Sequence, residues 1–535
     1  MQRIELDNFR VFGSPAGFDL APVTVLTGKN NSGKSSLIKA FLVLADYLEQ
    51  DDQTVLRLDG SRAIRYRISR FDDLRNWASE SKQVQIAYQS KGYHFSYSFS
   101  ERVAGGRVWL RKFVLTDVAS GAKLELVQFT DEERTLLKLE ERDQAFRLVL
   151  EQPMLEALLG PHAPWLTEAI ELRIEDEKIQ SSLVEQEASF AMAEALLQQM
   201  PGVSAIELIA SEFEKEKASL QQLRDKAQYT AVAVATHVRP APDTLYKGVV
   251  YLSDLHQFGR RLPDLISQGL NRGFVEAVAG NEQLAQQQVA AELVRLVEHE
   301  LVALFTLSVH HLGVNRTHQA RLYLVGETKS EINAVAEAYL RLDASGGADN
   351  EFLQHWADRF DIGTNVRVRN FANTAINIVA QRNGKQTNLV DMGFGSGQVL
   401  TILLQLAALV EQQSQTLSSS RRSSNPFVLI EEPEANLHPQ LQSLLAEMFT
   451  EVARKYGFQF ILETHSEYLI RNIQVLVKEQ PVKDLFKVYY FDKPNEANGK
   501  KHGHEMRLRD DGVFMDEFGE GFLVNHAADL AFKLF

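Results

Sequence analysis

The pattern of apolar and polar positions predicts two strands, a glycine loop and a helix at the start of the chain. Residues 1–12 alternate polar and apolar side chains, as a half-buried strand does, and Val23–Leu26 is a short apolar run typical of a buried strand. A loop with two glycines follows, and an apolar run that reaches Leu48 predicts a helix beginning at Ser36. A strand that leads through a glycine loop into a helix can bind phosphate at the helix N-terminus.

The period of the apolar positions divides the whole chain into three regions. Short alternating runs between Val84 and Val127 predict an antiparallel β meander, so we assign residues 1–130 to an N-terminal lobe. Residues 131–304 are predicted to form a mainly helical insertion. Strands and helices alternate in residues 305–535, which we assign to a C-terminal lobe. The sequence therefore predicts an α/β fold with a parallel sheet, whose two halves are separated by the insertion.

The helical pattern of the insertion is clearest in Ser204–Gln228, where the apolar positions are spaced as in a helix with a polar face. Two interpretations of this segment stay open. It is either an extended arm that serves as a partner surface, or a helical subdomain packed on the body of the protein. Its heptad pattern is too short to establish a coiled coil.

Composition excludes several classes of protein. The 535 residues contain 57 Lys and Arg against 71 Asp and Glu, a net charge of −14, so a nucleic acid could be bound only by a local basic patch. The absence of cysteine excludes disulfides, Cys-ligated zinc and Cys nucleophiles. The longest apolar run, Val399–Val410, is shorter than the roughly 18 residues of a membrane span, and the first residues do not resemble a secretory signal. We expect a cytoplasmic protein without a membrane partner.

The glycine loop matches the phosphate-loop pattern G-x-x-x-x-G-K-[ST] and lies between a predicted strand and a predicted helix, as its mechanism requires. Lys34 is expected to reach the β- and γ-phosphates of ATP, and the Ser35 hydroxyl to bind Mg²⁺. The predicted nucleotide-binding residues are Gly28, Lys29, Asn30, Asn31, Ser32, Gly33, Lys34, Ser35 and Ser36.

Two further strands end in residues suited to phosphoryl transfer. The apolar run FVLI ends in Glu431, expected to hold Mg²⁺, and Glu432, expected to orient or deprotonate the attacking water. A later apolar strand ends just before His465, which could reach a γ-phosphate. The predicted catalytic residues are thus Lys34, Glu432 and His465, and the predicted metal ligands are Ser35 and Glu431.

A second glycine-rich sequence, DMGFGSGQ, opens a predicted helix that continues from Gln398. A helix that begins with glycine, serine and glycine can bind an anion at its N-terminus. The predicted residues of this second anion site are Gly395, Ser396, Gly397 and Gln398.

Together these motifs resemble the ABC-type ATPase superfamily, in the branch that contains the SMC-like, RecF-like and OLD-like proteins. The matching motifs are GKNNSGKSS for Walker A, GFGSGQ for the signature loop, FVLIEEPEANLHP for Walker B and ETHS for the switch histidine. The resemblance implies an ABC-type P-loop ATPase head, with a parallel-sheet core, an antiparallel β meander and a helical insertion. It also implies ATP and Mg²⁺ as cofactors, and a head-to-head dimer in which the signature loop of one subunit closes over the ATP of the other.

Two departures from the superfamily pattern concern the metal and the γ-phosphate. Glu431 stands where most ABC proteins have Asp, although Glu is usual in this branch. No glutamine of the Q-loop is identified, and Phe71–Leu74 occupies its expected place.

The string EEPEANLHP is similar to that of OLD-like ATPases, and the C-terminal tail resembles the PtuA-type subunit of Septu and retron-linked anti-phage systems. The resemblance implies an ATPase subunit of a bacterial anti-phage defence complex, acting as a homodimer or higher homo-oligomer. Its nuclease would be a separate HNH-type chain, and a nucleic acid or a reverse transcriptase would be further partners. The alternatives are an SMC/RecF-like DNA-repair ATPase and a nucleotide-gated scaffold that does not hydrolyse ATP.

Three other features have a structural and a functional interpretation. We interpret His310, His311 and His318 as structural, because no carboxylates accompany them in the sequence. Arg10 either approaches the nucleotide or lies on the surface. A short basic segment is either a nucleic-acid contact or a solvated loop; it consists of Lys500, Lys501, His502, His504, Arg507 and Arg509.

Overall fold

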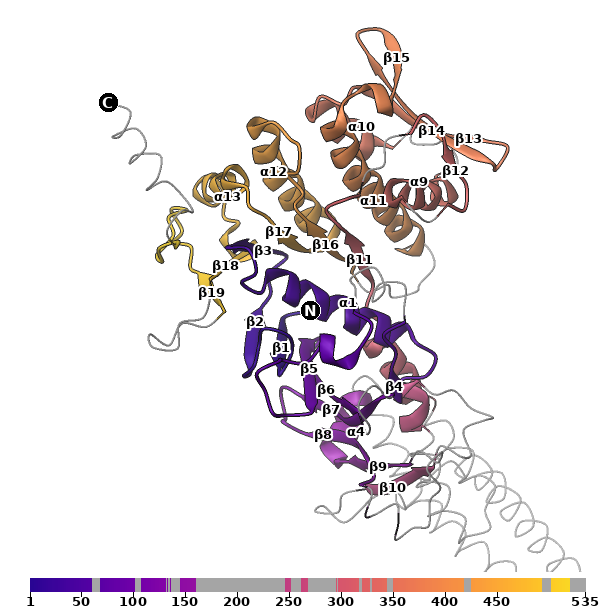
Figure 1. Ribbon diagram of the computed structural model, residues 1–535, viewed down its shortest axis with the longest axis vertical. Helices are drawn as coiled ribbons and strands as arrows, with labels where there is room; N and C mark the ends of the chain where they lie inside the picture. The colour runs from indigo at the N-terminus through magenta and orange to yellow at the C-terminus, as the bar shows by residue number, and fades with distance from the viewer. Residues whose placement is uncertain are drawn as a thin grey trace, which may run out of the picture.

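The computed structural model (Figure 1) places two sheets on either side of one buried helix. The residues that it describes are 1–59, 68–101, 107–130, 132, 135, 145–159, 246–251, 261–267, 295, 297–316, 320–327, 330–343, 350–417, 425–492 and 502–519.

The central sheet is assembled from segments that are far apart in the sequence. Its strands lie in the order β11 (Val309–Leu312), β16 (Phe427–Glu431), β17 (Gln459–Glu463), β3 (Val23–Gly28), β18 (Phe486–Phe491) and β19 (Gly503–Met506). All neighbours are parallel except β18 and β19. Since β3 pairs with β17 on one side and β18 on the other, the predicted α/β fold with a sheet built from two distant halves is confirmed.

Both faces of this sheet are buried, which explains its continuous apolar runs. Along β16, Phe427 and Leu429 belong to one hydrophobic core, and Val428 and Ile430 belong to the other. The first core lies between the two large sheets, and the second contains the helices of the C-terminal half.

The second large sheet is antiparallel and contains the predicted meander. Its order is β10 (Tyr246–Tyr251), β9 (Ala145–Leu150), β8 (Lys123–Gln128), β7 (Val108–Asp117), β6 (Tyr93–Glu101), β5 (Gln83–Ser90), β1 (Arg3–Asp7) and β2 (Ala16–Asp19), with β4 (Val55–Leu56) paired to β7. The sheet extends past residue 130, because β9 and β10 fall inside the predicted insertion of residues 131–304. Most of that insertion, including Ser204–Gln228, lies outside the described residues.

Helix α1 (Lys34–Glu49) connects the two sheets by burying side chains against both. The ring of Phe41 lies 5.1 Å from that of Phe427 on β16, and the ring of Tyr47 lies 5.0 Å from that of Phe99 on β6. The helix begins at Lys34, two residues before the predicted start, because Gly33 takes the cap position. The residues that bind phosphate in such loops are therefore held by a helix buried in the main core.

The C-terminal half adds helices and a small antiparallel sheet. The helices are α9 (Glu331–Leu342), α10 (Glu351–Arg359), α11 (Phe394–Leu417), α12 (Pro439–Tyr456) and α13 (Glu467–Glu479); the sheet contains β12 (Tyr323–Leu324), β13 (Thr364–Phe371), β14 (Ala375–Arg382) and β15 (Lys385–Asn388). Shorter elements are α4 (Gln152–Leu159) and the 3₁₀ turns η1 (Phe71–Asp73), η5 (Leu389–Asp391) and η6 (Lys483–Leu485).

Helix α11 begins at Phe394, four residues before the predicted Gln398, so the glycine-rich motif forms its first turn. Within the described part of the chain, α11 is the one helix long and apolar enough to cross a membrane. However, 67% of its most apolar stretch is buried inside the protein, as in the core helix of a globular domain.

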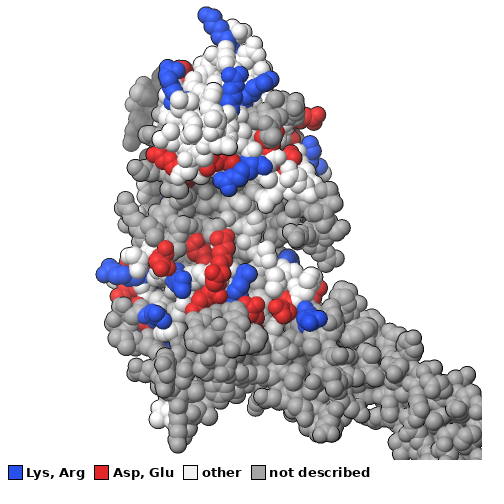
Figure 2. All heavy atoms as spheres, turned by 90° about the vertical axis from the view of Figure 1, so that its right-hand side faces the viewer, with Lys and Arg blue, Asp and Glu red and all other residues white. Residues whose placement is uncertain are grey.

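Charged side chains of both signs lie on the face that Figure 2 draws, which is the right-hand side of Figure 1. Figure 2 shows Asp and Glu gathered at mid-height on this face, while Lys and Arg predominate at the top, the end that carries the β13–β15 sheet in Figure 1. This segregation agrees with the expectation that basic residues form at most local patches in a chain of net charge −14.

A truncation in α11 tests its place in the core. Leu403→Ala removes a side chain that is fully buried, so we expect it to lower the free energy of unfolding by about 2–5 kcal/mol. Gln412→Ala, at an exposed position of the same helix, is the matched control and should change it by less than about 0.5 kcal/mol. Urea denaturation followed by circular dichroism measures both, and equal small effects would contradict the burial of α11.

Candidate functional site

A cavity of about 710 Å³ opens at the carboxyl ends of β3, β16 and β17. It is lined by Arg10, Val11, Asn30, Asn31, Ser32, Gly33, Lys34, Ser35, Ser36, Lys39, Glu432, Glu463 and His465. The three predicted catalytic residues therefore face one space, together with most of the predicted phosphate loop. Gly28, Lys29 and Glu431 are not among the lining residues.

Two glycines allow the phosphate loop to turn back against β18. Gly28 and Gly33 have φ of 119° and 124°, a conformation that other residues rarely adopt. A Cβ on Gly28 would lie 2.1 Å from the carbonyl oxygen of Phe491, and the backbone N–H of Lys29 donates to that same oxygen at 2.9 Å. The loop is thus fixed against the end of β18, and only glycine fits at residue 28.

Lys34 lies inside the loop and not in solvent. Its Nζ donates to the carbonyl oxygens of Gly28 at 3.0 Å and Lys29 at 2.8 Å. Burial lowers the pKa of Lys34, while the charges of Glu463 and Glu432 act in the opposite direction. The ammonium group is positioned at the N-terminus of α1, where the helix dipole also favours a bound anion.

Arg10 and Lys39 add two more cationic side chains to the cavity wall. Arg10 is held by hydrogen bonds from its Nη1 to the Asp73 carbonyl, at 2.7 Å, and from its Nε to the Ser36 hydroxyl, at 3.3 Å. Burial lowers the pKa of both Arg10 and Lys39. Together with Lys34, Arg10 and Lys39 give the cavity a positively charged wall suited to a polyanion such as a nucleoside triphosphate. Arg10 therefore lines the cavity, and its approach to a nucleotide stays a prediction.

Glu432 has a strained backbone that a buried arginine holds in place. Its φ is +43°, which is uncommon for a residue other than glycine. Arg316, fully buried, donates to the carbonyl oxygens of Gly313 at 2.7 Å, Glu431 at 2.7 Å and Glu432 at 2.5 Å. Burial lowers the pKa of Arg316 to about 10. Arg316 was missed in the sequence, because a single arginine near the start of the C-terminal lobe carries no recognisable motif.

His465 is positioned by Glu434, in the loop after β16, and by Ser466, the residue that follows it. Its backbone N–H donates to Glu434 Oε1 at 2.7 Å, and Ser466 caps α13 by accepting from the backbone N–H of Leu469 at 3.1 Å. Burial raises the pKa of Glu434. Burial also lowers the pKa of His465, with a smaller contribution from the charge of Lys34. The imidazole is therefore neutral at pH 7 and can donate one hydrogen bond into the cavity.

The acidic residue that contacts Ser35 is Glu463, which was not predicted as a site residue. Ser35 Oγ donates to Glu463 Oε1 at 3.1 Å, with Oε2 at 3.2 Å. Burial raises the pKa of Glu463 to about 7, and the charge of Glu431 acts in the same direction. The sequence signal was its place at the end of an apolar strand, two residues before His465.

Glu431 has a different partner. Its Oε1 lies 2.9 Å from Nε2 of His311, a side chain that is 3% exposed on β11. The expectation that the histidines of this segment lack carboxylate companions was therefore wrong for His311, because β11 pairs with β16 in the sheet. His310 lies 2.9 Å from the Ser308 hydroxyl, and His318 lies outside the described residues.

The oxygen donors near Ser35 fit Mg²⁺, which prefers carboxylates, hydroxyls and water over nitrogen. The Ser35 hydroxyl and the Glu463 carboxylate lie side by side, the Glu432 side chain lines the same cavity, and Glu431 ends the neighbouring strand β16. Among the described residues, no three His, Asp or Glu side chains form a metal site by themselves. Mg²⁺ in nucleotide sites binds one or two carboxylates and completes its shell with phosphates and water.

The predicted signature loop lies outside this cavity. Gly395 and Ser396 line a smaller cavity of about 180 Å³, together with residues 436–438 of the loop after β16. The Ser396 hydroxyl donates to the Met392 carbonyl at 3.0 Å, and Gln398 is 2% exposed. Gly397 is also buried. Within one chain, these residues do not reach the phosphate loop, and their action on a second copy stays a prediction.

The predicted basic segment is largely neutralised where the structure describes it. Arg507 pairs with Asp516 at 2.7 Å, and Arg509 pairs with Asp511. His502 contacts the phosphate loop, with Nδ1 at 3.2 Å from the Ser32 carbonyl oxygen. Lys500 and Lys501 lie outside the described residues. The two arginines are thus engaged within the protein.

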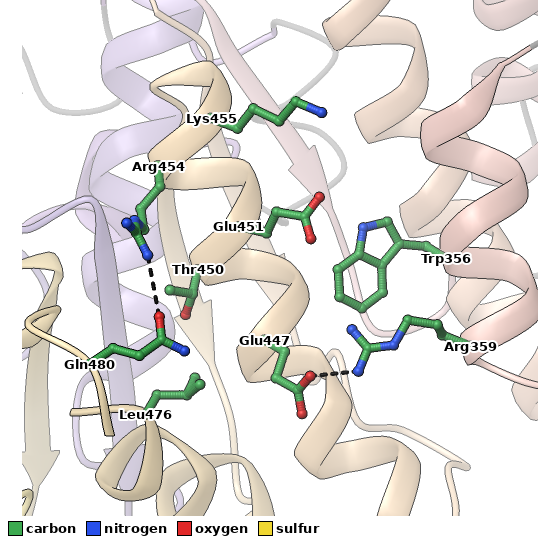
Figure 3. A pocket seen from close by; sticks show the side chains of 9 residues that line it. All are labelled: Trp356, Arg359, Glu447, Thr450, Glu451, Arg454, Lys455, Leu476 and Gln480. Carbon is green, nitrogen blue, oxygen red and sulfur yellow. Dashed lines mark hydrogen bonds and ion pairs between the residues drawn. The ribbon is translucent and has the colours of Figure 1, made fainter. Parts of the chain in front are cut away.

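A second large cavity, of about 520 Å³, lies between α10, α12 and the end of α13 (Figure 3). Its charged groups contact one another across the space: Arg359 donates to Glu447 at 2.6 Å and lies over the ring of Trp356 at 4.7 Å. Arg454 donates to Gln480 at 3.2 Å. No phosphate-loop residue lines this cavity, so it is separate from the candidate site.

The fold and the cavity define a P-loop nucleotide-binding protein of the α/β class. The sequence matches the AAA ATPase domain family over residues 1–228 and 324–470, and the chain belongs to this family. No curated protein matches the chain.

Solved structures of SMC head domains are also similar to the chain. One is the Smc head domain with an extended coiled coil bound to the C-terminal domain of ScpA, from Pyrococcus furiosus. It is 12% identical, with a TM-score of 0.34, over 100% of this chain and 98% of that chain. Another is the SMC head domain from Thermotoga maritima, 12% identical with a TM-score of 0.32, over 92% of this chain and 95% of that chain.

A substitution of Arg316 tests its hold on the strand end that carries Glu432. Arg316→Leu leaves three partly buried carbonyl groups without their donor, so we expect it to lower the free energy of unfolding by about 3 kcal/mol. The matched control is Arg321→Leu, since Arg321 forms an exposed pair with Asp391 and its loss should cost less than about 1 kcal/mol. Guanidinium denaturation measures both, and similar small effects would show that Arg316 is dispensable.

Proposed function

We propose that the chain is an ATP-binding and ATP-hydrolysing subunit of the ABC type, whose nucleotide-dependent dimer controls a separate nuclease in an anti-phage defence complex. The observation that supports hydrolysis is the single cavity in which Lys34, Glu432 and His465 face the phosphate loop. The defence role rests on the resemblance of EEPEANLHP to the OLD-like ATPases and of the C-terminal tail to PtuA-type subunits.

The reaction is attack of water on the γ-phosphate of ATP, which yields ADP and phosphate. Lys34 contacts the β- and γ-phosphates and stabilises the charge that develops on their oxygens. Glu432 orients the attacking water and accepts its proton, because it is the carboxylate at the end of β16 that lines the cavity. Neutral His465 donates a hydrogen bond to a γ-phosphate oxygen.

Mg²⁺, when bound, would neutralise charge on the phosphate oxygens, and the Ser35 hydroxyl with a carboxylate from the neighbouring strand ends would hold it. Arg10 and Lys39 line the same cavity, attract the triphosphate and help to position it.

Completion of the site by a second copy explains why the signature loop lies in a cavity of its own. Gly395 and Ser396 are partly exposed, and Phe394 at the helix start is 45% exposed. An N-terminal helix turn of this kind can contact an anion held by another subunit. ATP bound between two copies would then join them, and hydrolysis would release them and any nuclease partner that recognises the closed form.

Replacement of Lys34 tests nucleotide binding. Lys34→Ala removes the buried ammonium group that contacts phosphate, so we expect the affinity for ATP to fall by about 100-fold or more. Isothermal titration calorimetry with ATP and Mg²⁺ measures this change. Lys478→Ala, at an exposed position of α13, is the control and should bind ATP like the wild type. An unchanged affinity in Lys34→Ala would remove the phosphate-loop assignment.

Replacement of Glu432 tests hydrolysis and dimer closure together. Glu432→Gln keeps the size of the side chain but removes the base, so we expect phosphate release to fall by about 100-fold or more. ATP then stays bound, and light scattering should show an ATP-dependent rise to a dimer mass that persists in the variant. Glu479→Gln, exposed at the end of α13, is the matched control.

Two results would contradict this proposal in different ways. Normal turnover in Glu432→Gln would exclude Glu432 as the group that activates water. A constant mass with no turnover in either protein would favour the nucleotide-gated scaffold instead.

A further inference from the structure

The contact between Glu463 and Ser35 is set by the central sheet. Glu463 is the last residue of β17 and pairs with Leu26 of β3, the strand that leads into the phosphate loop. Both of its carboxylate oxygens lie near the Ser35 hydroxyl, at 3.1 and 3.2 Å. Backbone pairing therefore places this carboxylate beside the phosphate loop, independently of any flexible side chain on the surface.

The environment of Glu463 favours a cation next to it. The residue is 8% exposed, and among the described residues it forms no salt bridge within 4 Å. The charges of Lys34 and Lys39 act on it, but the Lys34 ammonium group already donates to the carbonyl oxygens of Gly28 and Lys29. Buried carboxylates are generally paired with a cation or coordinate a metal ion. The charges of Glu431 and Glu432 strengthen this preference.

Glu431, unlike Glu463, has its contact on the side of the sheet away from the phosphate loop. One of its carboxylate oxygens lies 2.9 Å from the buried imidazole of His311, on the strand away from β3. In the sheet, β17 lies between β16 and β3, so Glu463 is the strand-end carboxylate directly beside the phosphate-loop strand. Glu431 is one strand further away.

We propose that Glu463, with the Ser35 hydroxyl, is a direct ligand of the Mg²⁺ that accompanies the nucleotide, and that Glu431 acts on this metal only through its charge. The proposal rests on the proposed function, since nucleotide phosphates and water supply the remaining oxygen ligands. It reassigns the metal-binding carboxylate from the Walker B strand to the strand that precedes His465.

The test measures metal binding without hydrolysis. Mn²⁺ serves as the paramagnetic probe in place of Mg²⁺, and ADP as the nucleotide, so that no turnover takes place. Free Mn²⁺ is quantified by electron paramagnetic resonance in the presence of the ADP-bound 535-residue chain, and ADP binding is measured separately in EDTA by calorimetry. The variants are Glu463→Gln, which keeps a hydrogen-bond partner for Ser35, and Glu431→Gln as the matched comparison.

We expect Glu463→Gln to weaken Mn²⁺ binding to the ADP complex at least tenfold, while ADP affinity in EDTA changes less than threefold. Glu431→Gln should weaken Mn²⁺ binding less than threefold. Equal Mn²⁺ affinities for Glu463→Gln and the wild type, or a larger loss in Glu431→Gln, would overturn the proposal.

Further outcomes distinguish a failure of this inference from a failure of the proposed function. If Glu463→Gln does not fold, Glu463→Asp replaces it, because the shorter side chain keeps the charge but withdraws the carboxylate from the metal. Glu463→Asp should weaken Mn²⁺ binding at least threefold. Wild-type Mn²⁺ affinity in this variant would overturn the proposal. A wild-type chain that binds no ADP in EDTA and no ATP with Mg²⁺ would overturn the proposed function and this inference together. Normal ADP binding with wild-type Mn²⁺ affinity in Glu463→Gln would overturn only the inference.

Discussion

The parallel pairing of β3 with β17 and β18 is the constraint on which the site depends. It joins residues 23–28 to segments more than 400 positions away, and it aligns the phosphate loop with the carboxyl ends of the neighbouring strands. Parallel sheets place such strand ends along one edge, where loops can gather catalytic groups. Helix α1, buried against both sheets, then fixes the direction in which Lys34 and Ser35 face.

The site concentrates charges that would be costly if they lacked partners. Arg316 is buried among the carbonyl groups at the end of β16, and Glu434 accepts the N–H of His465. These contacts hold Glu432 in a left-handed backbone conformation, which costs about 1–3 kcal/mol and persists only where the surroundings determine it. The surroundings therefore fix the backbone at Glu432 and at His465, which line the same cavity.

Much of the site could be predicted because its motifs are local. The phosphate loop needs a strand, two glycines and a helix start within a dozen residues, and the structure has all of them in that order. The ends of two strands could also be predicted, because each apolar run stops at polar residues: β16 at Glu431, and β17 before His465. The predicted first residues of the helices were less accurate, because Gly33 and the glycines near Phe394 can belong either to a loop or to a first helical turn.

By itself, the sequence determined the α/β class, the meander, the phosphate loop and the carboxylates at the end of β16, because each follows from residue types at short spacing. Only the tertiary structure decided which carboxylate meets Ser35, which histidine meets Glu431, and that Arg316 holds the strand end. These contacts join residues 428, 120 and 116 positions apart, respectively. Strand order sets them, and strand order depends on how distant segments pair in the sheet, which no local pattern along the chain encodes.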